Sequence, residues 1–198
     1  MEFLSALFTA AFDSNIVFAQ LVGMVAVLLA AYRPQDAVRF GALLWAAVSV
    51  AGLIGWPVYA GFFAPWGVGY LAPVAYAAVS SIAIFVAGAV ACSGKDAAER
   101  ERILVLCTLL AVNAAVLGVP LGNAAAAETA TLASAAGTSV GAGLGAFIAV
   151  VLFATVRQRI DERLVPPALR GLPISLVAAS LMCMAFTCVA GIAGGLFA

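Results

Sequence analysis

Long apolar runs, separated by short polar or charged segments, follow one another along the whole chain. A helix that crosses a bilayer needs roughly 20 mostly apolar residues. Six runs approach or exceed that length, and they cover residues 3–31, 37–63, 68–92, 103–121, 132–156 and 172–197. The pattern therefore predicts an all-α integral membrane protein with six transmembrane helices. Only 9% of the residues are charged, against about 25% in a soluble domain, so little of the chain is expected outside the bilayer.

Polar residues interrupt two of these runs. Asp13, Ser14 and Asn15 lie within the first run, and Asn113 lies within the fourth, shortly before Gly118. Polar groups at bilayer depth are costly and usually mark a path or a site. We therefore predict that helices 1 and 4 are broken near the midplane.

Each interruption also has a simpler interpretation. The first crossing could begin only at Ile16, with residues 1–12 lying at the outer interface. Asn113 could make a single hydrogen bond across a helix interface, which is worth only about 0.6–2 kcal/mol in a membrane. The placement of the two interruptions in corresponding helices favours the paired breaks.

The basic residues predict the orientation. All nine Lys and Arg residues fall in or next to the connections between helices 1 and 2, 3 and 4, and 5 and 6. Cytoplasmic loops carry the excess of Lys and Arg in membrane proteins. We therefore expect these three connections in the cytoplasm and both termini outside.

Six helices divide into two sets of three, which must run in opposite directions through the membrane. The sequence thus predicts a 3+3 inverted repeat within one membrane domain (1–198), with halves at 1–92 and 103–198 joined by a charged cytoplasmic linker at 93–102. Asn15 and Asn113 are 98 residues apart, in the first helix of each half. In such repeats the corresponding breaks meet near the midplane.

Other candidate chemistry is sparse. The chain has no histidine, and its four cysteines form no C-x-x-C pair and lie in or at the end of apolar runs: Cys92, Cys107, Cys183 and Cys188. Free cysteine in such a place behaves as a small hydrophobe. No catalytic residue and no metal ligand set is predicted, and zero formal net charge gives no reason to expect a nucleic acid partner.

A stripe of small residues lies in the fifth run. Gly137, Gly141 and Gly145 recur every four residues, a spacing that places them on one helix face. Small residues let membrane helices approach closely. We interpret the stripe as a packing surface against a neighbouring helix.

Several segments resemble those of a known family. Its fourth-helix motif N-C-A-V-L-G-V is similar to Asn113–Val119, and its segment V-L-F-A-x-[IV]-R-x-R is similar to Val151–Arg159. Pro166–Phe186 is similar to the family's P-x-x-x-R-G…G-L-M-x-[LM]-A-F stretch, and Asn15–Gly23 loosely matches its first-helix motif N-F-V-L-x-x-x-x-G. Length, six spans and orientation also match. The chain therefore resembles the RnfA/NqrE family, whose members belong to the Rnf complex and to the Na⁺-translocating NADH:quinone reductase.

The resemblance implies a fold, partners and a cofactor. Members of this family lie in the bacterial inner membrane as six-helix inverted repeats, each paired with a sister membrane subunit of opposite orientation (RnfE/NqrD-like) and with the other Rnf/Nqr-type subunits. The two sister subunits hold a [2Fe-2S]-type intramembrane centre, to which each broken helix supplies one cysteine. The complex couples electron transfer, from ferredoxin or NADH, to Na⁺ or H⁺ transport.

The chain departs from this pattern at both cysteine positions. The family cysteines fall on Val25 and Ala114, and neither side chain can bind iron. Iron–sulfur clusters are held by cysteine thiolates in nearly all cases. We therefore transfer only the scaffold positions to this chain, namely Asn15, Gly23, Asn113 and Gly118, and predict no cofactor held by it.

The sequence predicts a non-autonomous membrane subunit of an Rnf/Nqr-like ion-translocating oxidoreductase complex. Two alternatives stay open. The chain could be a small stand-alone ion or solute transporter with Asp13 at its site, or a structural subunit that has lost its redox centre and only braces the complex.

Overall fold

The computed structural model describes residues 2–30, 34–111, 113–127, 129–189 and 195, and the part of the chain described holds helices and no strand. The predicted all-α class is thereby confirmed. The helices are α1 (Glu2–Phe8), η1 (Thr9–Asp13), α2 (Met24–Ala30), α3 (Pro34–Val58), η2 (Tyr59–Phe63), η3 (Gly69–Leu71), α4 (Ala72–Ala91), α5 (Ala97–Ala111), α6 (Ala114–Ala125), α7 (Leu132–Arg159), η4 (Pro167–Leu169) and α8 (Leu172–Val189).

Several of these helices suit a bilayer. In the described residues, three helical stretches are long and apolar enough to cross a membrane: Gln35–Phe63, Gly69–Ala91 and Leu132–Arg159. The pair α5 and α6, bent by 41° at the break between them, makes a fourth candidate. The first predicted helix forms the shorter pieces α1, η1 and α2, while α8 covers residues 172–189 of the last predicted helix, whose residues 190–194, 196 and 197 lie outside the described residues.

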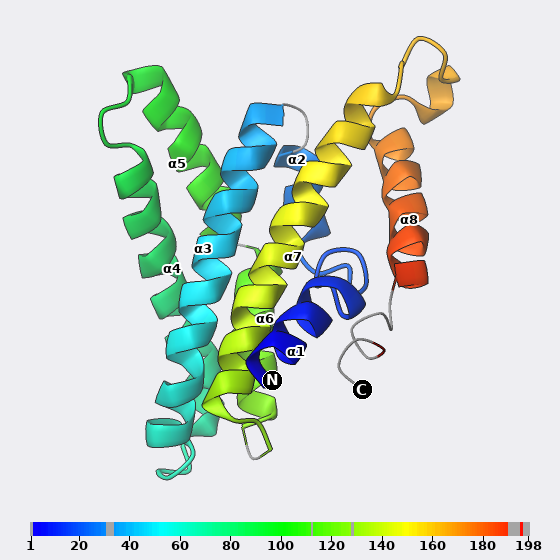
Figure 1. The fold of residues 1–198 in the computed structure, drawn as a ribbon. Helices are drawn as coiled ribbons and strands as arrows, with labels where there is room; N and C mark the ends of the chain where they lie inside the picture. Colours follow the sequence, from blue (N-terminus) through cyan, green and yellow to red (C-terminus); the bar gives the residue numbers. More distant parts are fainter. Residues whose placement is uncertain (1, 31–33, 112, 128, 190–194, 196–198) are drawn as a thin grey trace.

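The core is built around α3 and α7, which lie side by side through the centre of the molecule (Figure 1). Small residues permit this close approach, since a Cβ at Gly52 would meet the Ser139 side chain and one at Gly143 would meet Trp45. Phe40 and Phe153 are fully buried in this core.

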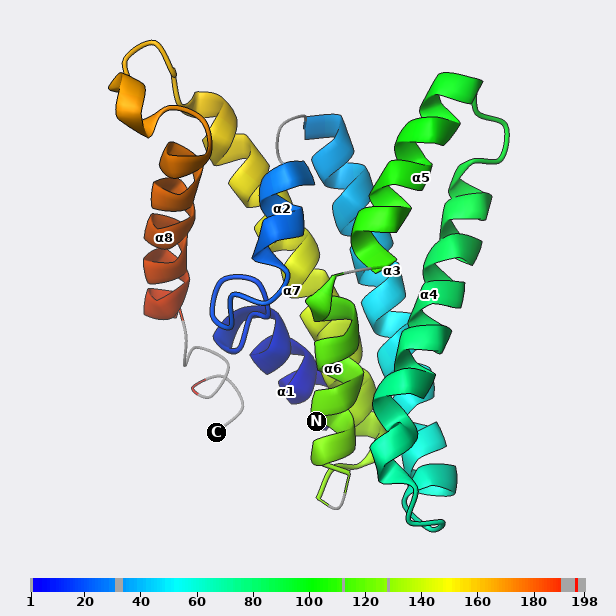
Figure 2. The same cartoon turned by 180° about the vertical axis from the view of Figure 1, so that it is seen from behind.

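The other helices pack around this central pair. The short α1 and η1 lie on α7, while α5 and α6 lie on α3. On the outside, α4 covers α3 and α8 covers α7 (Figure 2). Each of the two central helices therefore carries a divided helix on one side and an unbroken one on another.

The outer surface is apolar along its length. On α4, the side chains of Val74, Ile82, Val86 and Val90 are between 58% and 72% exposed. A soluble monomer rarely shows apolar patches of this extent, so this surface faces lipid or other membrane helices.

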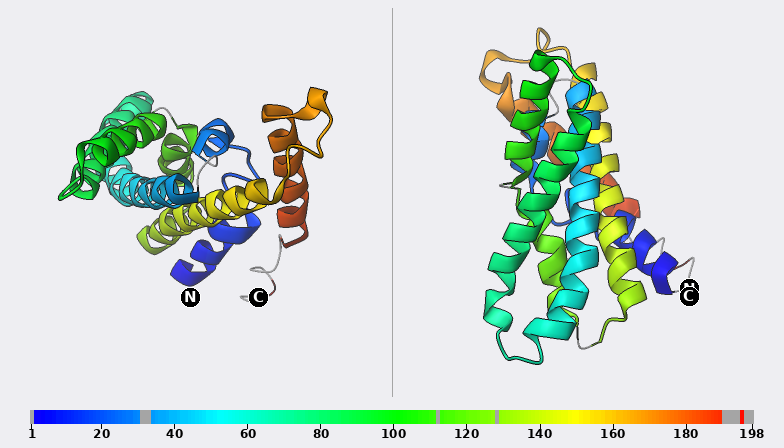
Figure 3. Two further views of the ribbon diagram at one scale, coloured as in Figure 1. Left: turned by 90° about the horizontal axis from the view of Figure 1, so that it is seen from above. Right: turned by 90° about the vertical axis from the view of Figure 1, so that its left-hand side faces the viewer.

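The connections that carry the basic residues lie at one end of the molecule (Figure 3). That end holds the α4–α5 and α7–α8 connections and the start of α3, where Arg39 binds Glu99 at 2.9 Å. Arg33 lies outside the described residues. The α3–α4 and α6–α7 connections lie at the opposite end, so the described basic connections share one side.

Candidate midplane crossing

The first helix stops at Asp13, and the backbone stays non-helical from residue 14 to residue 23. Asn15 is fully buried at the start of this segment. Its Nδ2 donates to the carbonyl oxygen of Ala11 at 2.9 Å, and its Oδ1 accepts from the amides of Val17 at 3.0 Å and Phe18 at 3.1 Å. One side chain thus bonds three backbone groups that the break releases from helical pairing. Broken backbone at membrane depth needs such partners.

Asp13 and Ser14 have different surroundings. The Ser14 hydroxyl is exposed and donates to the carbonyl oxygen of Thr9 at 3.2 Å. Asp13 has one buried carboxyl oxygen, Oδ1, without a hydrogen-bond partner, and none of the ion pairs in the described residues involves it. Asp13 does not line the three cavities described below.

The chain returns to helix through two residues with left-handed backbone. Leu21 has φ +56° and Gly23 has φ +75°. A bulky residue in this region is strained, whereas glycine adopts it freely. A Cβ at Gly23 would overlap Oδ1 of Asn113 and lie 3.0 Å from its Cγ. The two helix breaks therefore touch at this point.

The second break lies between α5 and α6, where Asn113 caps the N-terminus of α6. Its Oδ1 accepts from the amide of Ala115 at 2.9 Å, and its Nδ2 is buried without a partner. Farther along α6, a Cβ at Gly118 would be in ordinary contact with Ile16 and Val22 of the first break. Both breaks lie about halfway between the two ends of the molecule (Figure 2).

The two positions at which the family places cysteine line one cavity. Val25 and Ala114 share a cavity of about 300 Å³ with Gly23, Asn113 and other, apolar residues. Val25 is 72% exposed, so the cavity opens at the surface of the protein. The two positions are far apart in the sequence, and the fold brings them together.

The residues around this cavity do not fit an iron–sulfur cluster. No cysteine lines it, and the described residues hold no group of three or more Cys, Asp or Glu side chains that could bind a metal ion. Cys107 points the other way, because its Sγ lies 3.8 Å from the carbonyl oxygen of Ile84 on α4. The side chains at this cavity therefore offer no thiolate to a cluster.

The glycine stripe faces α1 and η1. A Cβ at Gly137 or Gly141 would overlap the carbonyl oxygen of Phe3 or Leu7, and one at Gly145 would lie 2.5 Å from that of Ala11. The Gly145 Cβ would also lie 2.8 Å from Nδ2 of Asn15. The stripe thus lets α1 and η1 lie against the backbone of α7, and this holds the first break in place.

Asn123 is a buried polar residue that the sequence pattern missed. The pattern predicts a polar connection after residue 121, but α6 continues to Ala125. The Asn123 amide nitrogen donates to the carbonyl oxygen of Ala135 at 3.2 Å and to the hydroxyl of Ser139 at 2.8 Å. The sequence does contain a signal for this residue, namely a third asparagine close to an apolar run. Its neighbours, a glycine and several alanines, made the segment resemble a connection.

The fold and the crossing define a multi-pass, all-helical membrane protein with two polar helix breaks that meet in its core. The model of the family described as "Rnf-Nqr subunit, membrane protein" matches residues 3–193. The chain belongs to the Rnf-Nqr family of membrane subunits, as its motifs predicted.

Named relatives cover nearly the whole chain. The chain is 31% identical over 187 residues to the A-type subunit of the Na⁺-translocating ferredoxin:NAD⁺ oxidoreductase complex of Acetobacterium woodii, a match that covers 94% of this chain and 95% of the relative. It is 29% identical over 193 residues to the A-type subunit of the ion-translocating oxidoreductase complex of an Azoarcus species, covering 96% of this chain and 97% of that relative.

Proposed function

We propose that this chain is a membrane subunit of an Rnf/Nqr-like complex in the bacterial inner membrane, which couples electron transfer from ferredoxin or NADH to Na⁺ or H⁺ transport. The observation that carries the proposal is the end-to-end match to the A-type subunits of such complexes. The contact between Gly23 and Asn113 adds support, because it joins the two breaks at mid-depth.

The proposal includes six spans in a 3+3 inverted repeat, with halves at 1–92 and 103–198. The packing supports this, because α1 lies on α7 as α5 lies on α3, and α8 lies on α7 as α4 lies on α3. The end that carries the basic connections faces the cytoplasm in this arrangement, and both termini face outward.

We also propose a sister membrane subunit of opposite orientation against the cavity that holds Val25 and Ala114. This cavity opens outward and its walls are apolar except at Asn113, which suits a membrane partner. This chain supplies no thiolate there. Its residues instead hold the two breaks together, through the contact of Gly23 with Asn113 and the contacts of Gly118 with Ile16 and Val22.

Purification of the intact assembly tests the proposal. A tagged copy of the chain should bring down other Rnf/Nqr-type subunits from membranes in mild detergent, and only that assembly should oxidise ferredoxin or NADH. The chain alone should show no redox activity. If it instead purified without such subunits, and catalysed uptake in liposomes that Asp13→Asn abolished, the stand-alone transporter would replace the proposal.

A bracing role is the second candidate, favoured by Val25 and Ala114 in place of thiol ligands. In that case the two helix breaks would have no part in turnover of the complex. Replacement of Asn15 and Asn113 by leucine in an assembled complex separates the two views. Loss of electron transfer in an intact complex supports the coupling role, and unchanged turnover supports bracing.

A further inference from the structure

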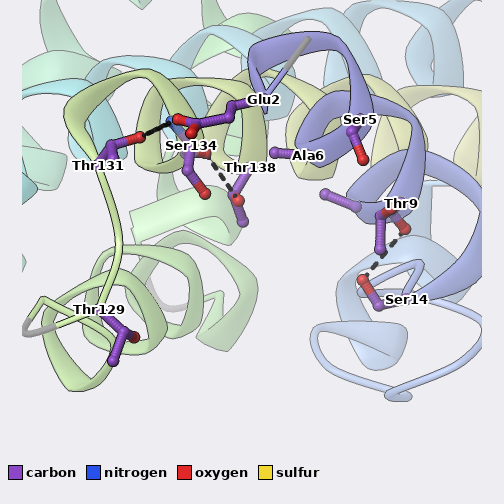
Figure 4. Close-up of a pocket in the computed structure, with 10 residues that line it drawn as sticks. Glu2, Ser5, Ala6, Thr9, Ser14, Thr129, Thr131, Ser134 and Thr138 are labelled. Atoms are coloured by element: carbon purple, nitrogen blue, oxygen red, sulfur yellow. Dashed lines mark hydrogen bonds between the residues drawn. The ribbon is translucent and has the colours of Figure 1, made fainter. Parts of the chain in front are cut away.

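A cleft lined with hydroxyl groups lies between α1–η1 and the first turns of α7 (Figure 4). Its volume is about 460 Å³, and it is on the half of the molecule away from the basic connections. Besides Glu2 and Thr129 at its margin, its hydroxyl-bearing walls come from three segments of the chain, with the residues Ser5, Thr9, Ser14, Thr131, Ser134 and Thr138.

A second cavity continues from this cleft toward the first break. It has a volume of about 250 Å³ and shares Ser14, Ser134 and Thr138 with the cleft. Its far walls include Gln20, within the first break, and Asn123 on α6. The two cavities therefore adjoin and lead from the surface toward mid-depth.

The hydroxyl groups present acceptor oxygens to this space. Thr138 donates to the carbonyl oxygen of Ser134 at 3.0 Å, and Ser14 donates to that of Thr9 at 3.2 Å. Thr131 donates to the Glu2 carboxylate at 2.8 Å, and its hydroxyl oxygen already accepts from the amide of Ser134 at 3.2 Å, which leaves it one lone pair. A hydroxyl group has one proton and two lone pairs, so a group that donates to its own chain retains oxygen lone pairs for a guest.

Bonding of Ser and Thr to the preceding turn is common in helices and needs no function by itself. That explains each hydroxyl singly, but it does not explain why seven hydroxyl-bearing residues line one cleft in an apolar protein. No Lys or Arg lines either cavity. The lining is therefore rich in oxygen acceptors and contains no positive side chain, which favours a cation over an anion.

The charge of the lining narrows the choice of cation. Glu2 supplies the one carboxylate, whereas sites for Ca²⁺ and Mg²⁺ use more negative charge or near-ideal geometry. The other lining groups do not titrate near neutral pH, so a relay of protons between side chains has no carriers beyond Glu2. The chemistry suits a partly hydrated monovalent metal ion.

We propose that the two cavities form an entry vestibule for Na⁺, which leads from the outer side to the first helix break. This inference rests on the proposed function, in which the complex transports an ion, and it names the ion and the residues on its route. Ser14, Ser134 and Thr138 line both cavities, and we assign the central role to Ser134 and Thr138 because they lie four residues apart on α7, on one face of that helix.

The test uses the intact complex in proteoliposomes, with NaCl replaced stepwise by choline chloride. The variant is Ser134→Ala combined with Thr138→Val, which removes two oxygen acceptors with little change in volume. We expect the Na⁺ concentration for half-maximal turnover to rise roughly fivefold or more, since each lost ligand of about 1 kcal/mol changes affinity about fivefold.

Two further variants keep the test specific. Thr155→Val, on the same helix, removes an exposed hydroxyl that bonds the carbonyl oxygen of Leu152 at 2.7 Å, and it should leave the Na⁺ dependence unchanged. Thr138→Ser retains the oxygen and should restore most of the affinity. Copurification of the other subunits with each variant shows that the complex has assembled.

Three outcomes would overturn the vestibule. The first is that the complex with the double variant assembles and needs the same Na⁺ concentration for half-maximal turnover as the complex with Thr155→Val. Another is turnover of the unaltered complex that builds a proton gradient and ignores Na⁺, which would leave the proposed function standing. The third is purification of the chain without redox subunits, which would remove the proposed function and this inference together.

Discussion

At the residue scale, Asn15 decides whether the first break can exist in a membrane. Its side chain bonds the carbonyl oxygen of Ala11 and the amides of Val17 and Phe18, and it is fully buried. Lipid offers no replacement partner for these groups. Asn113 has the same kind of role with a single bond, to the amide of Ala115, and it retains one unsatisfied donor.

Asn15→Leu keeps the approximate volume but removes all three bonds. Each buried group left unpaired costs about 1–3 kcal/mol, so we expect the free energy of unfolding to fall by about 3 kcal/mol or more. The midpoint of thermal unfolding of the complex in detergent measures the change. Gln20→Leu, at an exposed position nearby, serves as the control, and equal midpoints for the two variants would contradict the role of Asn15.

Substitutions at Leu21 and Gly23 should affect the stability of the protein differently. Gly23→Ala places a Cβ against Asn113 at φ +75°, and we expect a loss of about 2 kcal/mol or more. Leu21→Gly relieves a left-handed leucine, a gain of about 1–2 kcal/mol that the greater freedom of unfolded glycine partly offsets. Its midpoint should therefore equal or exceed the unaltered one, and a clear fall would argue against strain at Leu21.

At the scale of elements, α7 organises the crossing. One face of this helix presents Gly137, Gly141 and Gly145 to α1 and η1, and an adjoining face presents Ser134 and Thr138 to the cleft. Helices as short as α1 are marginal by themselves, so their position depends on this contact. Damage to the glycine face should therefore affect the first break even though the break lies on another segment.

Gly141→Ala tests this dependence. Its Cβ would overlap the carbonyl oxygen of Leu7, so α1 has to move, and overpacking of this kind costs about 1–3 kcal/mol. The thermal midpoint should fall accordingly. Gly122→Ala has open space at its Cβ and lies within α6, where alanine is favoured by up to about 1 kcal/mol. If both substitutions lowered the midpoint equally, the contact between Gly141 and α1 would not be important for stability.

At the scale of the whole molecule, α3 and α7 form the centre, and the cavity that holds Val25 and Ala114 opens at the surface beside them. The cavity beside the two helix breaks is therefore open at the surface of the protein. A sister membrane protein packed on this surface would complete the enclosure. In the proposed assembly, Val25 and Ala114, which stand where the resemblance places cysteines, lie at that contact.

Restoring thiols at both positions tests whether the scaffold is intact. In a complex assembled with its sister subunit, Val25→Cys with Ala114→Cys should raise the iron content and the visible absorbance, while either single substitution should give less. The matched pair Val74→Cys with Ile82→Cys lies on the exposed face of α4 and should add no iron. Failure of the double variant to gain iron would mean that the two positions do not share one centre with the partner.

The sequence predicted the long helices well, because α3, α4 and α7 are continuous apolar runs and any fold in a bilayer must keep them helical. It singled out Asn15 and Asn113, and their role as paired breaks of two membrane helices stays a prediction. The family resemblance pointed to Gly23, but the pattern of residues alone did not indicate a non-helical segment from residue 14 to residue 23, because that length depends on the local bonds of Asn15 and on the backbone of Leu21 and Gly23. The sequence also did not predict that the glycine stripe packs against α1 and η1, since that contact joins segments more than 100 residues apart.

The contact between the glycine stripe and α1 has a consequence for biosynthesis. The ribosome releases the first apolar run long before it makes Leu132–Arg159, yet the two short pieces of that run are held by this later helix. The contacts of α1 and η1 with α7 can therefore form only after Leu132–Arg159 has been made, which is more than 100 residues after the N-terminal segment.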